Sequence, residues 1–315
     1  MDDAPDRAPR GGAAAVPGPP GARYGGRMRA RRVLIAAAAL AVIAAGCDFP
    51  NVAPPGTAPQ RYRDALYTSG QVVKTADITY GTANNLSNQP ITLKLDVYGP
   101  PASDPVTKRP AIVWIHGGSF SGGDKTSPEI IDEATTFAQK GYVNVSTNYR
   151  LEPGGCSAGG VTASCIGAIQ EATADGQTAV AWLRSHASTY GVDPTRIAVA
   201  GTSAGAIVAA QVGYLSSETP ASAVKAAVAL SGANIFSNVN AGDAPALFFH
   251  GTADPLVPYQ WAVDTVNKAH DAHLDAYLET WPGEGHVPYV QHRDQILTQT
   301  RNFLWWEMGL AQAAH

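Results

Sequence analysis

One short segment restricts the fold more than any other part of this 315-residue chain. A strand-like run at 196–200, apolar after Arg196, is followed at once by Gly-Thr-Ser-Ala-Gly at 201–205 and then by a run of small residues. A strand that turns this sharply into a helix strains the serine between them, and only small flanking residues let the two backbones approach. The pattern predicts that Ser203 stands at a strand end, with its hydroxyl exposed beside a helix N-terminus. The alternative is a serine that only caps the helix.

The rest of the chain alternates between strand-like and helix-like patterns. Strands are predicted at 93–98, 111–115, 142–147, 196–200, 226–230, 246–249 and 276–280. Helices are predicted at 128–140, about 169–187, 204–211, 261–269 and 291–306. Such alternation is typical of a mostly parallel sheet that is covered on both faces by helices. We therefore expect one α/β domain over residues 76–315, with a single sheet of about eight strands.

A second glycine motif follows another buried strand, as His-Gly-Gly-Ser-Phe at 116–120. Consecutive glycines leave backbone N–H groups unshielded, so that an oxygen with developing negative charge can approach them. The N–H groups of Gly118, Ser119 and Ala204 are the predicted donors of an oxyanion hole. The alternative is an ordinary glycine turn. A phosphate-binding loop is disfavoured, because Asp124 stands where that motif has its lysine.

An activated serine needs a base and an acid that orients the base, and here the chain order would be Ser…Asp…His. Asp254 comes just past the end of a buried strand, and His286 follows the next one. Side chains at strand ends gather at one edge of such a sheet. We predict Asp254 as the acid and His286 as the base, with His250 and His116 as supporting residues. Taken alone, His286 would be interpreted as a surface histidine.

These motifs together resemble a known family. From about 90 to 306 the chain resembles the serine esterases of the α/β-hydrolase fold, in particular their His-Gly-Gly branch of hormone-sensitive-lipase-like and carboxylesterase-like enzymes. The resemblance rests on the segments 95–98, 116–118, 123–125, 148–151, 179–183, 191–197, 201–205 and 250–254, and on Asp175. It implies Ser203 as nucleophile, His286 as base and Asp254 as acid. It also implies the three oxyanion donors named above, and no metal or organic cofactor.

The resemblance implies hydrolysis of carboxylic esters through an acyl-enzyme. Short acyl groups, or esters on an accessible small molecule or polymer, are the expected substrates. Ser119 replaces the third glycine of a full His-Gly-Gly-Gly motif, and Thr202 replaces the usual aspartate of the elbow. These departures loosen the placement within the branch. Two alternatives remain open, a serine peptidase of the same fold and a catalytically inactive surface binding protein.

The N-terminus resembles an export signal. Three arginines within 29–32 precede an uncharged apolar run at 33–46, which is too short to span a membrane, and Cys47 follows. We expect residues 1–46 to be a leader and signal peptide, with translation starting at Met1 or Met28. The segment 44–47 resembles the bacterial lipoprotein box, although Ala44 departs from its usual larger aliphatic residue. The expected product is exported, and it is either anchored outside the cytoplasmic membrane by lipid on Cys47 or secreted.

The two other cysteines, Cys156 and Cys165, lie among glycines and predict a short disulfide loop, with two free thiols as the alternative. Residues 47–75 are rich in proline and are expected to form a tether. Beyond the signal, residues 48–315 hold 15 basic and 23 acidic side chains. This acidity disfavours nucleic acid and anionic lipid as partners. Membrane contact is therefore expected only through lipid on Cys47.

Overall fold

The computed structural model describes residues 49–156 and 161–313. The predicted signal peptide and Cys47 lie outside these residues. Within the described part of the chain, no helix is both long and apolar enough to cross a membrane.

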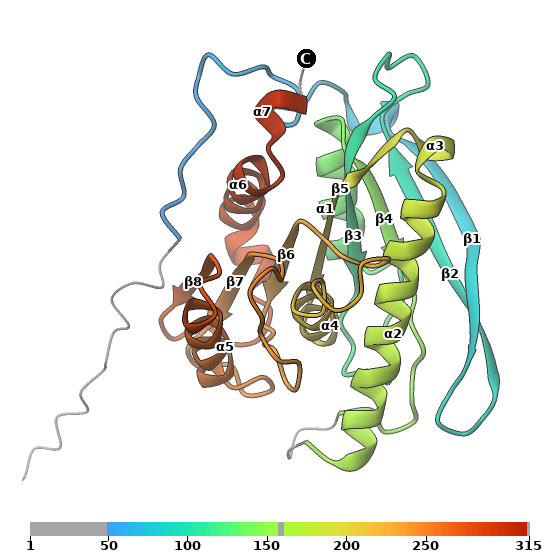
Figure 1. Cartoon of the computed structure of the whole chain (residues 1–315), viewed down its shortest axis with the longest axis vertical. Coiled ribbons are helices and arrows are strands. Elements are labelled where there is room, and N and C mark those ends of the chain that lie inside the picture. The colour runs from blue at the N-terminus through green and yellow to red at the C-terminus, as the bar shows by residue number, and fades with distance from the viewer. Residues whose placement is uncertain (1–48, 157–160, 314–315) are drawn as a thin grey trace, which may run out of the picture. The chain divides into compact units, whose positions relative to one another are not determined.

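The core of the fold is one sheet of eight strands, as the sequence predicts (Figure 1). Its spatial order is β1-β2-β4-β3-β5-β6-β7-β8, and the six strands from β4 to β8 in this order are mutually parallel. β1 and β2 join one edge in antiparallel pairing. The strands are β1 (Val73–Asn84), β2 (Pro90–Gly99), β3 (Arg109–Ile115), β4 (Val143–Thr147), β5 (Val192–Thr202), β6 (Ala226–Leu230), β7 (Ala246–Gly251) and β8 (Ala276–Trp281).

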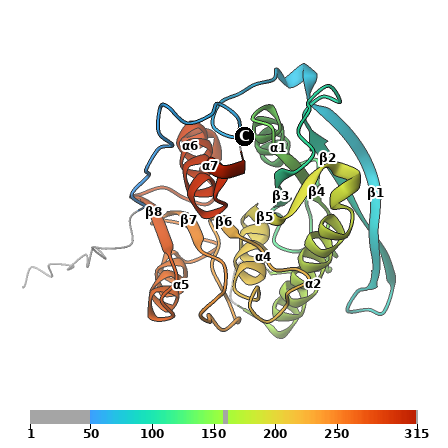
Figure 2. The same ribbon diagram turned by 45° about the horizontal axis from the view of Figure 1, so that its top comes forward.

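Helices cover both faces of the sheet. Figure 2 shows α1, α6 and α7 on one side, with α2, α4 and α5 on the other. The described helices are η1 (Ser69–Gln71), α1 (Pro128–Gln139), α2 (Ala163–Ser185), α3 (Ala187–Tyr190), α4 (Ala204–Gly213), α5 (Tyr259–Asp271), α6 (Tyr289–Glu307) and α7 (Leu310–Ala313). α2 begins earlier than the predicted start near residue 169, because Thr162 caps it.

Two apolar clusters fill the space between the sheet and these helices. Successive side chains of a strand point to opposite faces, and β3 shows this alternation. Val113 and Ile115 pack in the cluster under α2, α4 and α5, whereas Ile112 and Trp114 pack in the cluster under α1 and α6. A strand buried on both faces must be apolar throughout, which explains why this run has no polar alternation.

The expected tether differs from the structure. Over its described part it packs against the domain, where Tyr62 is fully buried and donates its N–H to the carbonyl oxygen of Lys140 at 2.9 Å. Further upstream, the ring of Phe49 lies 5.3 Å from that of Tyr277. β1 then begins at Val73, inside the segment expected to be free. These contacts could not be predicted from the proline-rich composition, because single aromatic residues that do not recur at a helical or strand spacing give no secondary-structure signal.

Candidate active site

The predicted turn is present between β5 and α4. Ser203 has φ 54° and ψ −118°, a rare positive-φ conformation that costs a non-glycine residue about 1–3 kcal/mol. The flanking glycines make this turn fit. A Cβ on Gly205 would overlap the carbonyl oxygen of Ile115 at the end of β3, and a Cβ on Gly201 would lie 2.5 Å from the backbone of Gly205. The strained serine is therefore held by the central strands of the sheet.

The structure brings the three predicted residues of the triad together. The hydroxyl of Ser203 lies 2.7 Å from Nε2 of His286, and Nδ1 of His286 lies 2.7 Å from Oδ2 of Asp254. Ser203 follows β5, Asp254 follows β7 and His286 follows β8. Because these strands are parallel, their carboxyl ends meet at one edge of the sheet. The geometry allows Nδ1–H to donate to Asp254, which leaves Nε2 free to accept the serine proton.

The buried carboxylate of Asp254 has three hydrogen bonds and a fourth close contact, with His250. Its Oδ1 accepts the N–H groups of Leu256 at 2.8 Å and Val257 at 3.0 Å. Nε2 of His250 lies 3.2 Å from Oδ2, which places this predicted supporting residue directly on the acid. Burial alone would raise the pKa of Asp254, but the bonds from His250, His286 and the backbone outweigh it and hold this pKa far below the usual range. Asp254 is therefore an anion that fixes the orientation of His286.

The second glycine motif forms a tight loop after β3. Ser119 and Phe120 have φ angles of 53° and 61°, and Gly118 has φ 120°. The carbonyl oxygen of Gly118 accepts two hydrogen bonds of 3.0 Å, from the N–H groups of Ser121 and Gly122. No acceptor within residues 49–156 and 161–313 takes the N–H of Gly118, Ser119 or Ala204. These N–H groups are thus available to stabilise an oxyanion.

His116, the other predicted supporting histidine, packs under the backbone of this loop and contacts it. Its ring is buried and stacks on the ring of Tyr149 with 4.4 Å between centroids. Its Nδ1 lies 2.6 Å from the carbonyl oxygen of Gly117, and the Tyr149 hydroxyl donates to the carbonyl oxygen of His116 at 3.1 Å. Burial lowers the pKa of His116, which favours the neutral ring. Sequence reasoning quoted Tyr149 only within a family motif and missed this role.

A cavity of about 210 Å³ opens beside Ser203. Ser119 and Ala204 line it, whereas Gly118 does not, so two of the three predicted oxyanion donors border the cavity directly. Its other walls are mostly apolar and include Phe120, Ile169, Ile207, Leu256 and Trp261. No sequence pattern marks these apolar residues, because a cavity wall has the same composition as a core.

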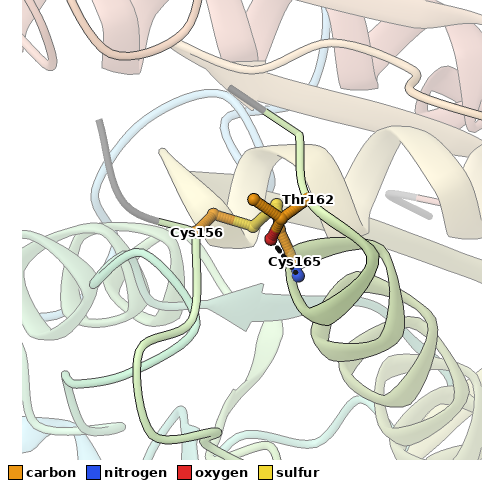
Figure 3. Close-up of a disulfide and its surroundings, with 3 residues drawn as sticks. All are labelled: Cys156, Thr162 and Cys165. Carbon is orange, nitrogen blue, oxygen red and sulfur yellow. Dashed lines mark hydrogen bonds between the residues drawn. A yellow bond between two sulfur atoms is a disulfide. The ribbon is translucent and has the colours of Figure 1, made fainter. Parts of the chain in front are cut away.

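The predicted disulfide between Cys156 and Cys165 forms and also lines this cavity. Cys165 lies in the first turn of α2, and its N–H donates to the hydroxyl of Thr162 at 3.2 Å (Figure 3). Thr162 is the N-cap of α2, so the helix begins at the disulfide.

Two family models match the chain, each over slightly less than half of it. The BD-FAE model matches residues 95–233, and the Phospholipase/Carboxylesterase model matches residues 168–303. Both ranges include the turn at Ser203.

The chain is also similar to curated hydrolases, including an esterase. Phenmedipham hydrolase of Pseudarthrobacter oxydans is 37% identical over 99 residues, which are 31% of this chain and 18% of that protein. Para-nitrobenzyl esterase of Bacillus subtilis (strain 168) is 33% identical over 117 residues, 36% of this chain and 22% of that protein. The chain spans about a quarter or less of the length of the curated relatives it matches, with 26% and 27% for two Dictyostelium discoideum proteins.

Among solved structures, native esterase Est2 of Thermogutta terrifontis is similar in fold, with a TM-score of 0.60 and 22% identity. The match covers 76% of this chain and 93% of that one. The sheet order, the strained turn at Ser203 and these matches show that the chain has the α/β-hydrolase fold and is similar in sequence to carboxylesterases and other hydrolases.

Proposed function

We propose that this protein is a serine hydrolase of carboxylic esters. The observation that carries the proposal is the chain of two 2.7 Å contacts from Ser203 through His286 to Asp254. Ser203, at one end of this chain, lines an apolar cavity. A serine with this geometry has a base for its proton and an anion to orient that base. The N–H groups beside it, which have no acceptor among the described residues, supply the electrostatic stabilisation that acyl transfer requires.

The reaction proceeds in two halves. Oγ of Ser203 attacks the ester carbonyl carbon while its proton passes to Nε2 of His286, and the carbonyl oxygen becomes an anion bound by the three N–H groups. His286 then gives its proton to the oxygen of the leaving alcohol, and the acyl group stays on Ser203. Water repeats the attack through His286, releases the carboxylic acid and restores the hydroxyl. Asp254 remains ionised throughout, since its hydrogen bonds hold its pKa far below the usual range.

The size of the cavity supports a short acyl group. A space of about 210 Å³ with apolar walls suits a chain of a few carbons. The related fold of Thermogutta terrifontis Est2 has been solved with butyrate and with propionate bound, which supports the same substrate class. A neighbouring hollow of about 630 Å³ shares Val161, Ile235 and Trp261 with the cavity and extends to Phe236. We assign this hollow to the alcohol part of the ester, so esters on larger molecules can also reach Ser203.

Hydrolysis of p-nitrophenyl acetate tests the activity. The wild-type protein should turn the ester over, and Ser203→Ala should lose about 10⁴-fold or more in kcat with unchanged folding. Ser217→Ala is the matched control, because Ser217 lies beyond α4 and outside the cavity, and it should keep full activity. Equal turnover by wild type and Ser203→Ala would refute the proposal.

A series of p-nitrophenyl esters tests the substrate class. We expect kcat/KM to peak between two and four acyl carbons and to fall by about tenfold or more at eight carbons, because a longer chain exceeds the cavity. Ile169→Ala should shift the peak toward longer chains, since Ile169 forms part of the cavity wall. A profile that rises steadily to ten carbons would contradict the assignment.

Export is a further part of the proposal. The basic and apolar segments at 29–46 support a signal peptide, and the disulfide suits an oxidising compartment. In a bacterial host, fractionation should find the protein outside the cytoplasm. A lipoprotein would incorporate labelled fatty acid and lose it in Cys47→Ala, whereas a secreted protein would incorporate none. Protein confined to the cytoplasm would contradict both forms.

A further inference from the structure

The loop that carries Ser119 is held by a second segment, residues 150–156, which we call the clamp segment. The N–H of Cys156 donates to the carbonyl oxygen of Ser119 at 2.8 Å, and the N–H of Glu152 donates to that of Phe120 at the same distance. A Cβ on Gly155 would overlap the carbonyl oxygen of Ser119, so the two backbones are in direct contact here. These bonds join parts of the chain that are far apart in sequence.

These hydrogen bonds act where the backbone is strained. Ser119 and Phe120 both have positive φ, which costs a non-glycine residue about 1–3 kcal/mol and persists only where the surroundings enforce it. The peptide before Ser119 is fixed within the loop, through the two bonds to the carbonyl oxygen of Gly118. The peptide after Ser119 is fixed by Cys156 alone among the described residues. Release of Cys156 would let Ser119 relax and turn its N–H away.

The clamp segment is anchored on α2 at both of its ends. At its start, the guanidinium of Arg150 pairs with the buried carboxylate of Asp175 at 2.9 Å, and the N–H of Arg150 donates to the same group. At its end, the disulfide joins Cys156 to Cys165 in the first turn of α2 (Figure 3). Cys165 is buried in the apolar cluster under α2. A covalent path therefore runs from this cluster to the hydrogen bond on Ser119.

We propose that the Cys156–Cys165 disulfide is a positioning element of the oxyanion hole. This inference rests on the proposed esterase activity and goes beyond it. Cys156 touches no reacting atom and acts through the carbonyl oxygen of Ser119. Opening the disulfide should weaken the stabilisation of the oxyanion, and it should leave the apolar cavity able to bind neutral ligands.

Two inhibitors separate these effects. Oγ of Ser203 adds to the carbonyl carbon of an aryl trifluoromethyl ketone, and the serine proton passes to His286. The carbonyl oxygen becomes an oxyanion that the N–H groups bind. Butanol fills the apolar cavity and develops no charge. In Cys156→Ala/Cys165→Ala, the Ki of the ketone should rise at least about tenfold and kcat should fall alike, because full loss of one oxyanion donor costs 10²–10³-fold. The Ki of butanol should change less than about twofold.

Ile169→Ala is the matched control, because Ile169 lines the same cavity and makes no bond to Ser119. It should weaken both inhibitors by a similar factor. If the cysteine variant does not fold, wild type reduced with a phosphine and then reoxidised gives the same test, and reoxidation should restore kcat.

If opening the disulfide changed the Ki of both inhibitors by the same factor, the disulfide would act only as a wall of the cavity, and the positioning role would be overturned. Unchanged Ki and kcat values would overturn it as well. These outcomes differ from a failure of the proposed function. In that case the oxidised wild type itself would neither hydrolyse esters nor bind the ketone.

Discussion

Ser203 and Ser119 line the same cavity with strained backbones, but they are held in different ways. Two nearby glycines let the turn at Ser203 pack directly against the ends of central strands, which hold it in place. Ser119 depends on hydrogen bonds from the clamp segment and on a disulfide. The nucleophile is thus held by the sheet itself, whereas the oxyanion loop is held by the clamp segment, which lies outside the sheet. Damage near Ser203 should cost stability or the whole reaction, and damage near Ser119 should cost only part of the rate.

The largest effect is expected at the sheet-held triad. Asp254→Asn keeps the size of the side chain but removes the anion that orients His286, so kcat should fall by roughly 10³–10⁴-fold. Steady-state kinetics with p-nitrophenyl acetate measures it. Asp275→Asn changes an exposed carboxylate before β8 and should stay within about twofold of wild type. A loss below about tenfold for Asp254→Asn would contradict the assigned acid.

The turn at Ser203 should respond to substitution through stability. Gly205→Ala adds a methyl group onto the carbonyl oxygen of Ile115, and we expect the melting temperature to fall by at least about 5 °C. Intrinsic helix propensity alone would favour alanine by about 1 kcal/mol, so the sign of the change is diagnostic. Gly70→Ala, where a Cβ meets nothing within 4 Å, should shift the melting temperature by about 1 °C or less. An unchanged Gly205→Ala protein would remove the distinction between the two regions.

The clamp segment offers a matched pair of glycines with positive φ. A Cβ at Gly155 would overlap the carbonyl oxygen of Ser119, whereas at Gly154 it would meet nothing within 4 Å. We expect Gly155→Ala to lower kcat by about tenfold with a smaller loss of stability than Gly205→Ala, because only the oxyanion loop moves. Gly154→Ala carries the backbone strain alone and should keep kcat within about twofold. Equal kcat values for the two variants would show that the clamp segment does not position Ser119.

The smallest effect concerns pH. Burial and the neighbouring carboxylate of Glu152 in the clamp segment raise the pKa of Glu171 on α2 to about 7. The folded protein thus holds this proton where the unfolded chain has lost it, so stability falls as pH rises from about 4.5 to about 7. Glu171→Gln cannot lose a proton, and the difference in melting temperature between pH 5 and pH 8 should shrink by about 1–2 °C. An unchanged or larger difference would contradict this account of Glu171.

The sequence predicted the turn at Ser203 better than the oxyanion loop at Ser119, for a physical reason. The turn at Ser203 is encoded by neighbouring residues, and the parallel strands bring Asp254 and His286 to the same edge. The oxyanion loop was predicted from its glycines, but its support by Tyr149 and Cys156 depends on tertiary contacts that leave no local pattern. For the same reason β1 and the packed part of the expected tether were missed.

Covalent labelling tests the central claim most directly. A fluorophosphonate reacts with a serine only when a base activates its hydroxyl and an oxyanion hole receives the phosphoryl oxygen. Mass spectrometry of the digested protein should find one phosphonyl group, on the peptide that contains Ser203. The label should be absent from Ser203→Ala and should form much more slowly in Asp254→Asn. Labelling of a different serine, or no labelling of the folded wild-type protein, would contradict the account.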